Sequence, residues 1–226
     1  MNQKTVNSPA VLRFSPLNPS PVSPWELTMF RNRLRAGLAH VSEALHEPEA
    51  FALRWHAEGA PYPLWVFAAL TLTAIAGTLT YGMTMGVLGG AGRMLQTGLA
   101  CTFAAGVAWS LPLPALYILG SVTGSRLRAS TTFLAALVTT SWGGLAMIAS
   151  VPINLFFTTA LPYPWFVLLV NLVVFAGVGV AMIDVFARTM QALEPARGKA
   201  PAWWLALVGA IGAELFYALG LFQFAS

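Results

Sequence analysis

Long apolar runs separated by short polar segments dominate the chain from residue 63 onward. A helix needs about 20 apolar residues to cross a bilayer. Five segments meet this requirement, so the pattern predicts an all-α, polytopic membrane protein with five transmembrane helices. The expected spans are residues 63–84, 94–119, 132–157, 165–186 and 202–224, within a transmembrane domain of residues 63–226.

A different pattern precedes the first span, in residues 26–62. Apolar residues recur there at steps of three and four, which is typical of one face of an amphipathic helix. The residues of this stripe are Leu27, Phe30, Leu34, Leu38, Val41 and Leu45. Pro48 ends the helix, and a second, short helix is expected over residues 49–58. The amphipathic helix either lies on the cytoplasmic leaflet or packs against a partner or its own membrane domain, and the pattern favours neither.

Residues 1–25 form a third region, rich in Pro, Ser and Asn. They lack the apolar core of 7–15 residues that a secretory signal peptide requires. We therefore expect an extended tail without a hydrophobic core of its own.

The placement of basic residues predicts the orientation. Eleven of the twelve lie before the first span, between the second and third spans, or between the fourth and fifth spans. Arg93 lies on the other side. The positive-inside rule then places the N-terminus in the cytoplasm and the C-terminus outside. Trp residues at the predicted span ends are typical of membrane interfaces; they are Trp65, Trp165, Trp203 and Trp204.

Composition supports the membrane class. Hydrophobic residues make up 57% of the chain and charged residues 9%, with a mean hydropathy of +0.70, whereas a soluble domain carries about 25% charged residues. No block of like charge indicates nucleic-acid binding. Arg outnumbers Lys ten to two and Ala is abundant, which favours a GC-rich bacterial genome and hence the bacterial inner membrane.

Glycine and proline mark the packing of the spans. Gly82, Gly86 and Gly90 are four residues apart, the spacing that allows two membrane helices to approach closely. Pro112 and Pro114 lie in the second span and Pro152 in the third. Each proline removes a backbone donor, so we expect kinks at these positions.

The stretch "LPLPALYILGSVTGSRLRAS", with the third span and "SVPINLFF" after it, resembles the bacterial branch of the Yip family. The similarity covers roughly residues 63–224 and includes the five-span plan. Its motif residues are Pro114, Leu116, Tyr117, Gly124, Ser125, Arg126 and Pro152. The resemblance implies a membrane scaffold or adaptor rather than an enzyme.

Candidate catalytic and metal-binding groups are sparse. His40, His46 and His56 all precede the first span, so no histidine is expected at membrane depth to ligate a metal or haem or to activate a serine. We therefore expect neither an enzyme nor a cofactor, although a bound lipid is compatible with the sequence. The two acids near or inside spans are Asp184 and Glu214.

Glu214 is the most informative residue of the spans. It lies eleven positions after Trp203, which corresponds to a depth of about 16 Å. An acid at this depth needs hydrogen-bond partners. The mid-depth candidates are Thr73, Thr78, Ser110, Ser141 and Asn171. Two roles of Glu214 are then possible. We favour a structural role, as a lock between helices or a contact to another subunit. The alternative is a proton or cation site.

Two functions follow from these alternatives. The first is a non-catalytic, Yip-like scaffold or accessory subunit of a membrane complex. In it, the tail and the region of Arg31, Arg33 and Arg35 contact other membrane-protein subunits or lipid headgroups. The second is a small transporter or channel component that uses Glu214.

Overall fold

The computed structural model describes residues 24–59, 62–197 and 203–221. The side chains of residues 24–27, 30, 33, 34, 37, 197 and 203–206 are outside this description. The chain divides into two compact units, Met1–Arg35 and Ala36–Ser226. The predicted tail, residues 1–25, therefore lies almost entirely outside the described residues. The fold below is that of the second unit.

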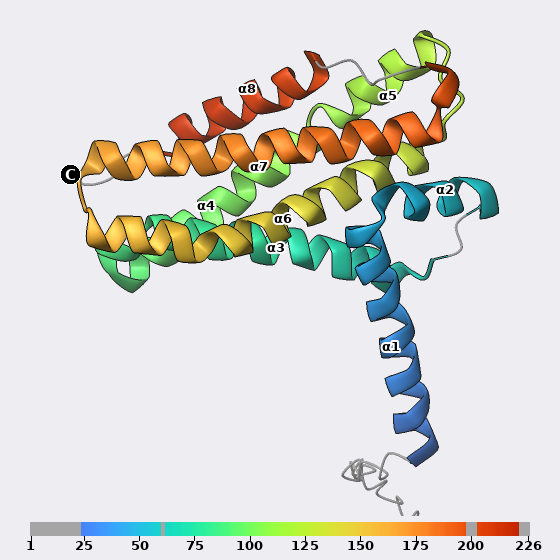
Figure 1. Ribbon diagram of the computed structural model, residues 1–226, viewed down its shortest axis with the longest axis horizontal. Coiled ribbons are helices and arrows are strands. Elements are labelled where there is room, and N and C mark those ends of the chain that lie inside the picture. The colour runs from blue at the N-terminus through green and yellow to red at the C-terminus, as the bar shows by residue number, and fades with distance from the viewer. Residues whose placement is uncertain (1–23, 60–61, 198–202, 222–226) are drawn as a thin grey trace, which may run out of the picture. The chain divides into compact units, whose positions relative to one another are not determined.

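All regular elements in the described ranges are helical. Two helices, α1 (Pro24–His46) and α2 (Pro48–Glu58), precede the apolar part of the chain. The remaining elements are α3 (Leu64–Met85), η1 (Val87–Gly89), α4 (Gly90–Ser110), α5 (Leu113–Val122), α6 (Ala129–Ala160), α7 (Pro164–Leu193), η2 (Pro195–Arg197) and α8 (Trp203–Ala218). Figure 1 shows α3, α4, α6, α7 and α8 running alongside one another.

Four helical segments are long and apolar enough to cross a membrane: α3, the segment Val87–Val122, α6 and α7. They correspond to the first four predicted spans. The predicted fifth span corresponds to α8, which is shorter, and residues 222–224 of that span lie outside the described residues. The structure therefore supports a membrane-embedded, multi-pass protein with four candidate spans.

The second of these segments is broken at its prolines. Helix α4 ends at Ser110 and α5 begins at Leu113, with Leu111 and Pro112 between them. Proline lacks the N–H that would continue the ladder of helical hydrogen bonds. The kink expected near Pro112 and Pro114 is thus a change from one helix to the next. Helix α6, in contrast, continues through Pro152, which is exposed.

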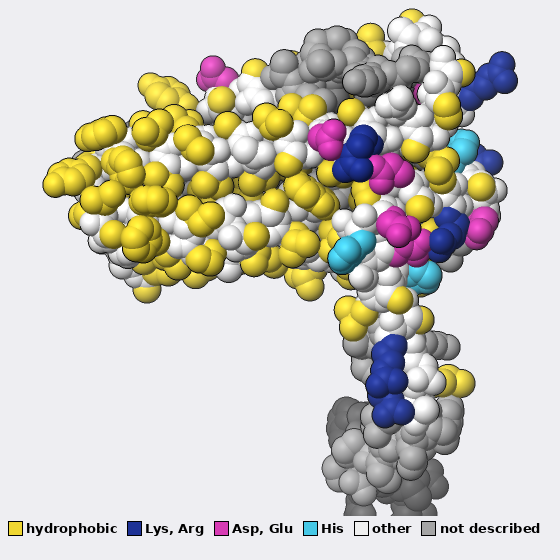
Figure 2. Space-filling model, viewed as in Figure 1, with side chains coloured by type: hydrophobic (Ala, Val, Ile, Leu, Met, Phe, Trp, Pro, Cys, Tyr) yellow, Lys and Arg dark blue, Asp and Glu magenta, His cyan; other side chains and the backbone are white. Residues whose placement is uncertain are grey.

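The helices pack in the order α7, α6, α3, α4, α8, with the most extensive contact between α3 and α6. At one end, α2 contacts α6 and α7, and α5 contacts α6. We call this end, formed by α2, residues 123–128 and residues 184–196, the charged end. Figure 2 shows Lys, Arg, Asp, Glu and His side chains gathered there, whereas hydrophobic side chains cover most of the visible face away from it. Charged side chains at one end and apolar side chains over the rest are typical of a membrane domain whose charged loops lie at one membrane–water interface.

Candidate functional site at the charged end

The turn between α5 and α6 contains the motif residues Gly124, Ser125 and Arg126. Gly124 has a φ of +92°, a left-handed conformation that glycine adopts without a steric penalty. The N–H of Ser125 donates to the carbonyl of Gly120 at 2.9 Å, so the turn satisfies an α5 carbonyl that the helix leaves unpaired. Glycine at this position thus allows the chain to reverse toward α6.

Glu194, at the C-terminal end of α7, holds this turn. The Ser125 hydroxyl lies 2.9 Å from each carboxylate oxygen of Glu194 and donates to them. The backbone N–H of Arg126 donates to Oε1 of the same carboxylate, also at 2.9 Å. Hydrogen bonds to a charged acceptor are stronger than neutral ones. Sequence reasoning selected Ser125 and Arg126 but missed Glu194, because no local signal connects residues 69 positions apart.

A cavity of about 520 Å³ lies beside this turn. His56 of α2, Arg126 and Glu194 contribute to its wall. Within the described part of the chain, Nδ1 of His56 is buried and has no hydrogen-bond partner. Three residues of the wall thus carry an imidazole, a guanidinium and a carboxylate, and the Glu194 carboxylate already accepts the hydrogen bonds of the turn.

Helix α2 is attached to the bundle by both charge and apolar packing. Arg188 of α7 bridges two acids: Nη1 lies 2.6 Å from Glu49 of α2, and Nε lies 2.9 Å from Asp184. On the apolar side, the rings of Phe51 and Tyr62 stack with centroids 4.1 Å apart. Both rings belong to a buried cluster of Ala44, Phe51, Tyr62, Val66, Leu70, Leu134 and Val138. Asp184, predicted as an intramembrane polar residue, is therefore an exposed ion-pair residue of the charged end.

The helices before the first span were predicted to lie on the membrane surface or to pack on a partner or on the protein's own membrane domain. The buried cluster around Ala44 supports packing on the protein's own domain for part of this region. Ala44 and Phe51 are completely buried, and Val41 is packed against the same cluster. Residues 41–58 therefore pack on the protein's own membrane domain. Arg31 and Arg35 lie in the other unit and are exposed, and the side chain of Arg33 is outside the described residues.

Two buried hydrogen bonds join the spans away from the charged end. The Tyr81 hydroxyl of α3 donates to Oδ1 of Asn171 of α7 at 2.9 Å. Nδ2 of Asn154 of α6 donates to Oγ1 of Thr84 of α3 at 2.6 Å. Asn171 and Asn154 are both completely buried. The polar position predicted at Asn171 is thus a link between helices, as buried polar groups in a membrane require.

Two of the three glycines with the predicted spacing stand at a close contact between helices. A Cβ on Gly82 would lie 2.6 Å from Cβ of Cys101, and one on Gly86 would overlap Thr97, so both residues allow α3 to approach α4. At Gly90 an added Cβ would meet no atom within 4 Å. Gly90 instead has a φ of +79° at the start of α4. A spacing of four residues does not distinguish close packing from a turn conformation.

Another close approach involves a pair of glycines that the predicted spacing did not include. A Cβ on Gly77 would overlap the backbone of Gly144. A Cβ on Gly144 would lie 2.7 Å from the carbonyl oxygen of Thr73. These residues stand at the contact between α3 and α6.

Glu214 is predicted to be a lock between helices or a contact to another subunit. Its side chain is exposed on α8, and it has no hydrogen-bond or ion-pair partner among the described residues. Of the expected partners, Thr78 donates to Thr102, Asn171 binds Tyr81, and Oγ of Ser141 has no partner in the described residues. None of these groups bonds to Glu214 within the described residues, and the alternative contact of Glu214 to another subunit stays a prediction.

The other motif residues do not converge on the charged-end turn. Pro114 is exposed in the first turn of α5, Tyr117 is also exposed, and Leu116 is half-buried against the core. Pro152 lies on α6. The structure thus places Gly124, Ser125 and Arg126 together and separates them from the remaining motif positions.

Comparisons with known proteins assign neither a family nor a function to the chain. No family model matches the chain, and no curated protein or solved structure matches it.

Proposed function

We propose that the chain is a non-catalytic integral membrane scaffold or accessory subunit of a larger membrane complex, comparable to the Yip family. The observation that supports this proposal best is the exposure of Glu214 on α8. We further propose that α8 completes a fifth span, with the N-terminus in the cytoplasm and the charged end at the cytoplasmic face.

A carboxylate that faces lipid at mid-depth is unfavourable. Insertion of an ionised residue at the centre of a membrane helix costs about 2.5–3.5 kcal/mol. Within the described residues, α8 packs chiefly on α4, and Glu214 is not covered by that contact. A second protein subunit that packs on this face of α8 would supply the missing hydrogen-bond partner.

The same observation favours a subunit over a carrier or channel. A coupling acid in a carrier belongs beside the substrate path, between the helices. Glu214 does not line either of the two cavities described for this chain. Asp184, the other acid of the apolar segments, is paired with Arg188 at the charged end.

The experiment places a photo-crosslinking amino acid at Tyr217, one turn after Glu214 and 75% exposed. A matched control carries it at Val173 of α7, which is 63% exposed. We expect one discrete cross-linked polypeptide from position 217 and only lipid adducts from position 173. Mass spectrometry then identifies the partner.

Two further measurements make the test decisive. Glu214→Leu should reduce the cross-linked product at position 217, whereas Gln, which retains hydrogen-bonding groups, should preserve more of it. Purified chain in liposomes should show no proton flux. Equal cross-linking at both positions together with Glu214-dependent flux would overturn the subunit proposal in favour of a transport role.

A further inference from the structure

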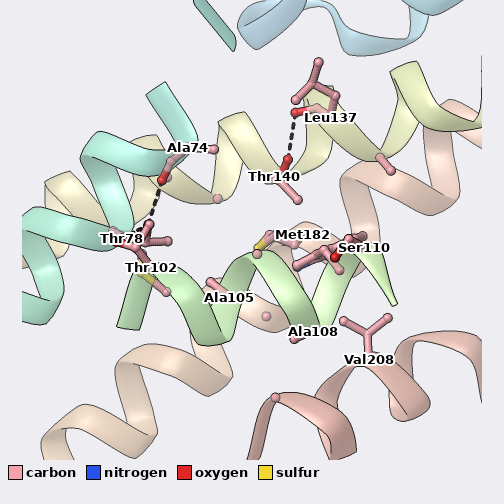
Figure 3. A pocket seen from close by; sticks show the side chains of 18 of the residues that line it. Ala74, Thr78, Thr102, Ala105, Ala108, Ser110, Leu137, Thr140, Met182 and Val208 are labelled. Carbon is pink, nitrogen blue, oxygen red and sulfur yellow. Dashed lines mark hydrogen bonds between the residues drawn. The ribbon is translucent and has the colours of Figure 1, made fainter. Parts of the chain in front are cut away.

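A second cavity, of about 550 Å³, lies between α3, α4, α6, α7 and α8. Figure 3 shows residues from several of these helices around it, including Thr78, Thr102, Thr140 and Val208. Its volume falls in the range of roughly 300–1,000 Å³ that is typical of small-molecule sites. Its walls consist of helices that are long and apolar enough to cross a membrane, together with α8.

The wall of this cavity offers little to a polar ligand. No Asp, Glu, Lys, Arg or His is among its described lining residues. The threonine hydroxyls of the wall already donate within the protein: Thr78 to Thr102, Thr102 to the carbonyl of Gly98, and Thr140 to that of Leu137. A polar ligand would lose its hydrogen bonds to water on entry without replacement. The chemistry therefore selects a hydrocarbon.

The cavity is long in the direction of the helices. On α6 its lining extends from Phe133 to Met147, which at a rise of about 1.5 Å per residue corresponds to about 21 Å. That length is about two thirds of the roughly 30 Å hydrocarbon core of a bilayer. An extended chain parallel to the helices fits such a space better than a compact ring system does.

Three glycines help to keep the space open. Gly106 of α4, Gly179 of α7 and Gly209 of α8 line the cavity, and a Cβ at each would have no atom within 4 Å. Neither close packing nor a positive φ explains them, in contrast to Gly77 and Gly82. Glycine within a helix is less stable than alanine by about 0.5–1 kcal/mol. What the three glycines share is that each lines the cavity and places no side chain in it.

We propose that this cavity binds a single hydrocarbon chain of a membrane lipid, either an acyl chain of a phospholipid or an isoprenoid chain. The chain lies along α6 with its contacts on the glycine-lined wall. This site is separate from the charged end and from Glu214, so it does not depend on the proposed role as a subunit.

The test uses the full chain, purified from membranes in mild detergent, with bound lipid measured by native mass spectrometry. Gly179→Leu and Gly106→Leu place a side chain in the cavity. Gly177→Leu is the matched control, because Gly177 is on α7, is exposed, has an open Cβ position and does not line the cavity. We expect one retained lipid per chain in the wild type and in the control.

The two cavity variants should retain at least about tenfold less lipid. The new side chain displaces at least about two methylene groups of the lipid, and the burial free energy of two methylene groups corresponds to a tenfold change in affinity. Solvent extraction of the retained lipid then distinguishes the two sources of the chain. Equal retention in all four proteins would mean lipid bound around the outside of the helices and would overturn the proposal. No retained lipid in the wild type would overturn it as well.

A second measurement on the wild type covers the case in which a cavity variant does not fold. Phospholipid with a photoactivatable group in its acyl chain is added to the purified protein. Labels at the lining residues Thr140 and Met147 would support the site. Labels confined to Leu145 and Phe156, which are exposed and do not line the cavity, would overturn it.

Discussion

The hydroxyl of Tyr81 donates a hydrogen bond to Oδ1 of Asn171, across 90 positions of sequence and in the completely buried interior between α3 and α7. Asn171 in turn donates from Nδ2 to the carbonyl of Val167 on its own helix at 2.7 Å. The bond between Asn154 and Thr84 links α3 to α6 close by. Together these bonds fix three helices relative to one another at positions where apolar packing alone permits sliding.

Tyr81→Phe should destabilise the protein by about 1–3 kcal/mol, because Oδ1 of Asn171 would stay buried without a donor. The measurement is reversible unfolding of the purified protein by denaturant in detergent. Tyr163→Phe is the control, since Tyr163 is 62% exposed, and it should change the free energy of unfolding by less than about 0.5 kcal/mol. An equal effect of the two variants would contradict a structural role for this bond.

Gly144→Ala should push α6 away from α3, since its new methyl group would lie 2.7 Å from the carbonyl oxygen of Thr73. Overpacking of this kind costs about 1–3 kcal/mol. Gly177→Ala, in an open position of α7, should instead be neutral or stabilising by up to about 1 kcal/mol. Thermal unfolding of the two variants side by side tests the opposite signs.

Glu194→Ala should loosen the turn between α5 and α6, because Ser125 and the N–H of Arg126 would both lose their acceptor. Hydrogen bonds to charged groups contribute about 1.5–3 kcal/mol. Hydrogen–deuterium exchange should therefore accelerate at residues 125–127 and stay unchanged in α3. Glu58→Ala, at an exposed position of α2, should leave the exchange at this turn as it is in the wild type.

Alkaline pH should weaken the packing of α2. Burial raises the pKa of the Tyr62 phenol above its ordinary value; Arg54 opposes this shift and Glu43 and Glu58 add to it. Because the folded pKa is the higher one, the phenol contributes stability below about pH 10 and loses it as the pH rises through the folded value. Tyr62→Phe should flatten the alkaline fall in the free energy of unfolding, whereas Tyr163→Phe should not.

Hydropathy located the first four spans well, because an apolar run of sufficient length has few alternatives to a membrane helix. It ended the fourth span at residue 186, whereas α7 continues to Leu193. Asp184 and Arg188 form an ion pair one helical turn apart. Such pairs stabilise a helix, but charged residues lower the hydropathy, so the hydropathy profile ends the span too early. Conversely, α8 ends at Ala218, short of the predicted 224, within a described range that stops at residue 221.

The candidate site was only partly predictable. Ser125 and Arg126 could be selected because they belong to a local motif, but their acceptor, Glu194, follows α7 and has no local signature. The bond between Tyr81 and Asn171 was not predictable either, because these residues are 90 positions apart and share no local motif. Gly90 shows a different limit, because its regular spacing in the sequence does not reveal that its φ is positive.

The bond between Ser125 and Glu194 also determines an order of events during synthesis. The turn between α5 and α6 leaves the ribosome 69 residues before the carboxylate that completes it. Helices α6 and α7 must therefore be made before Ser125 and Arg126 find their acceptor. The loop between the second and third spans takes its final form only after the fourth span exists.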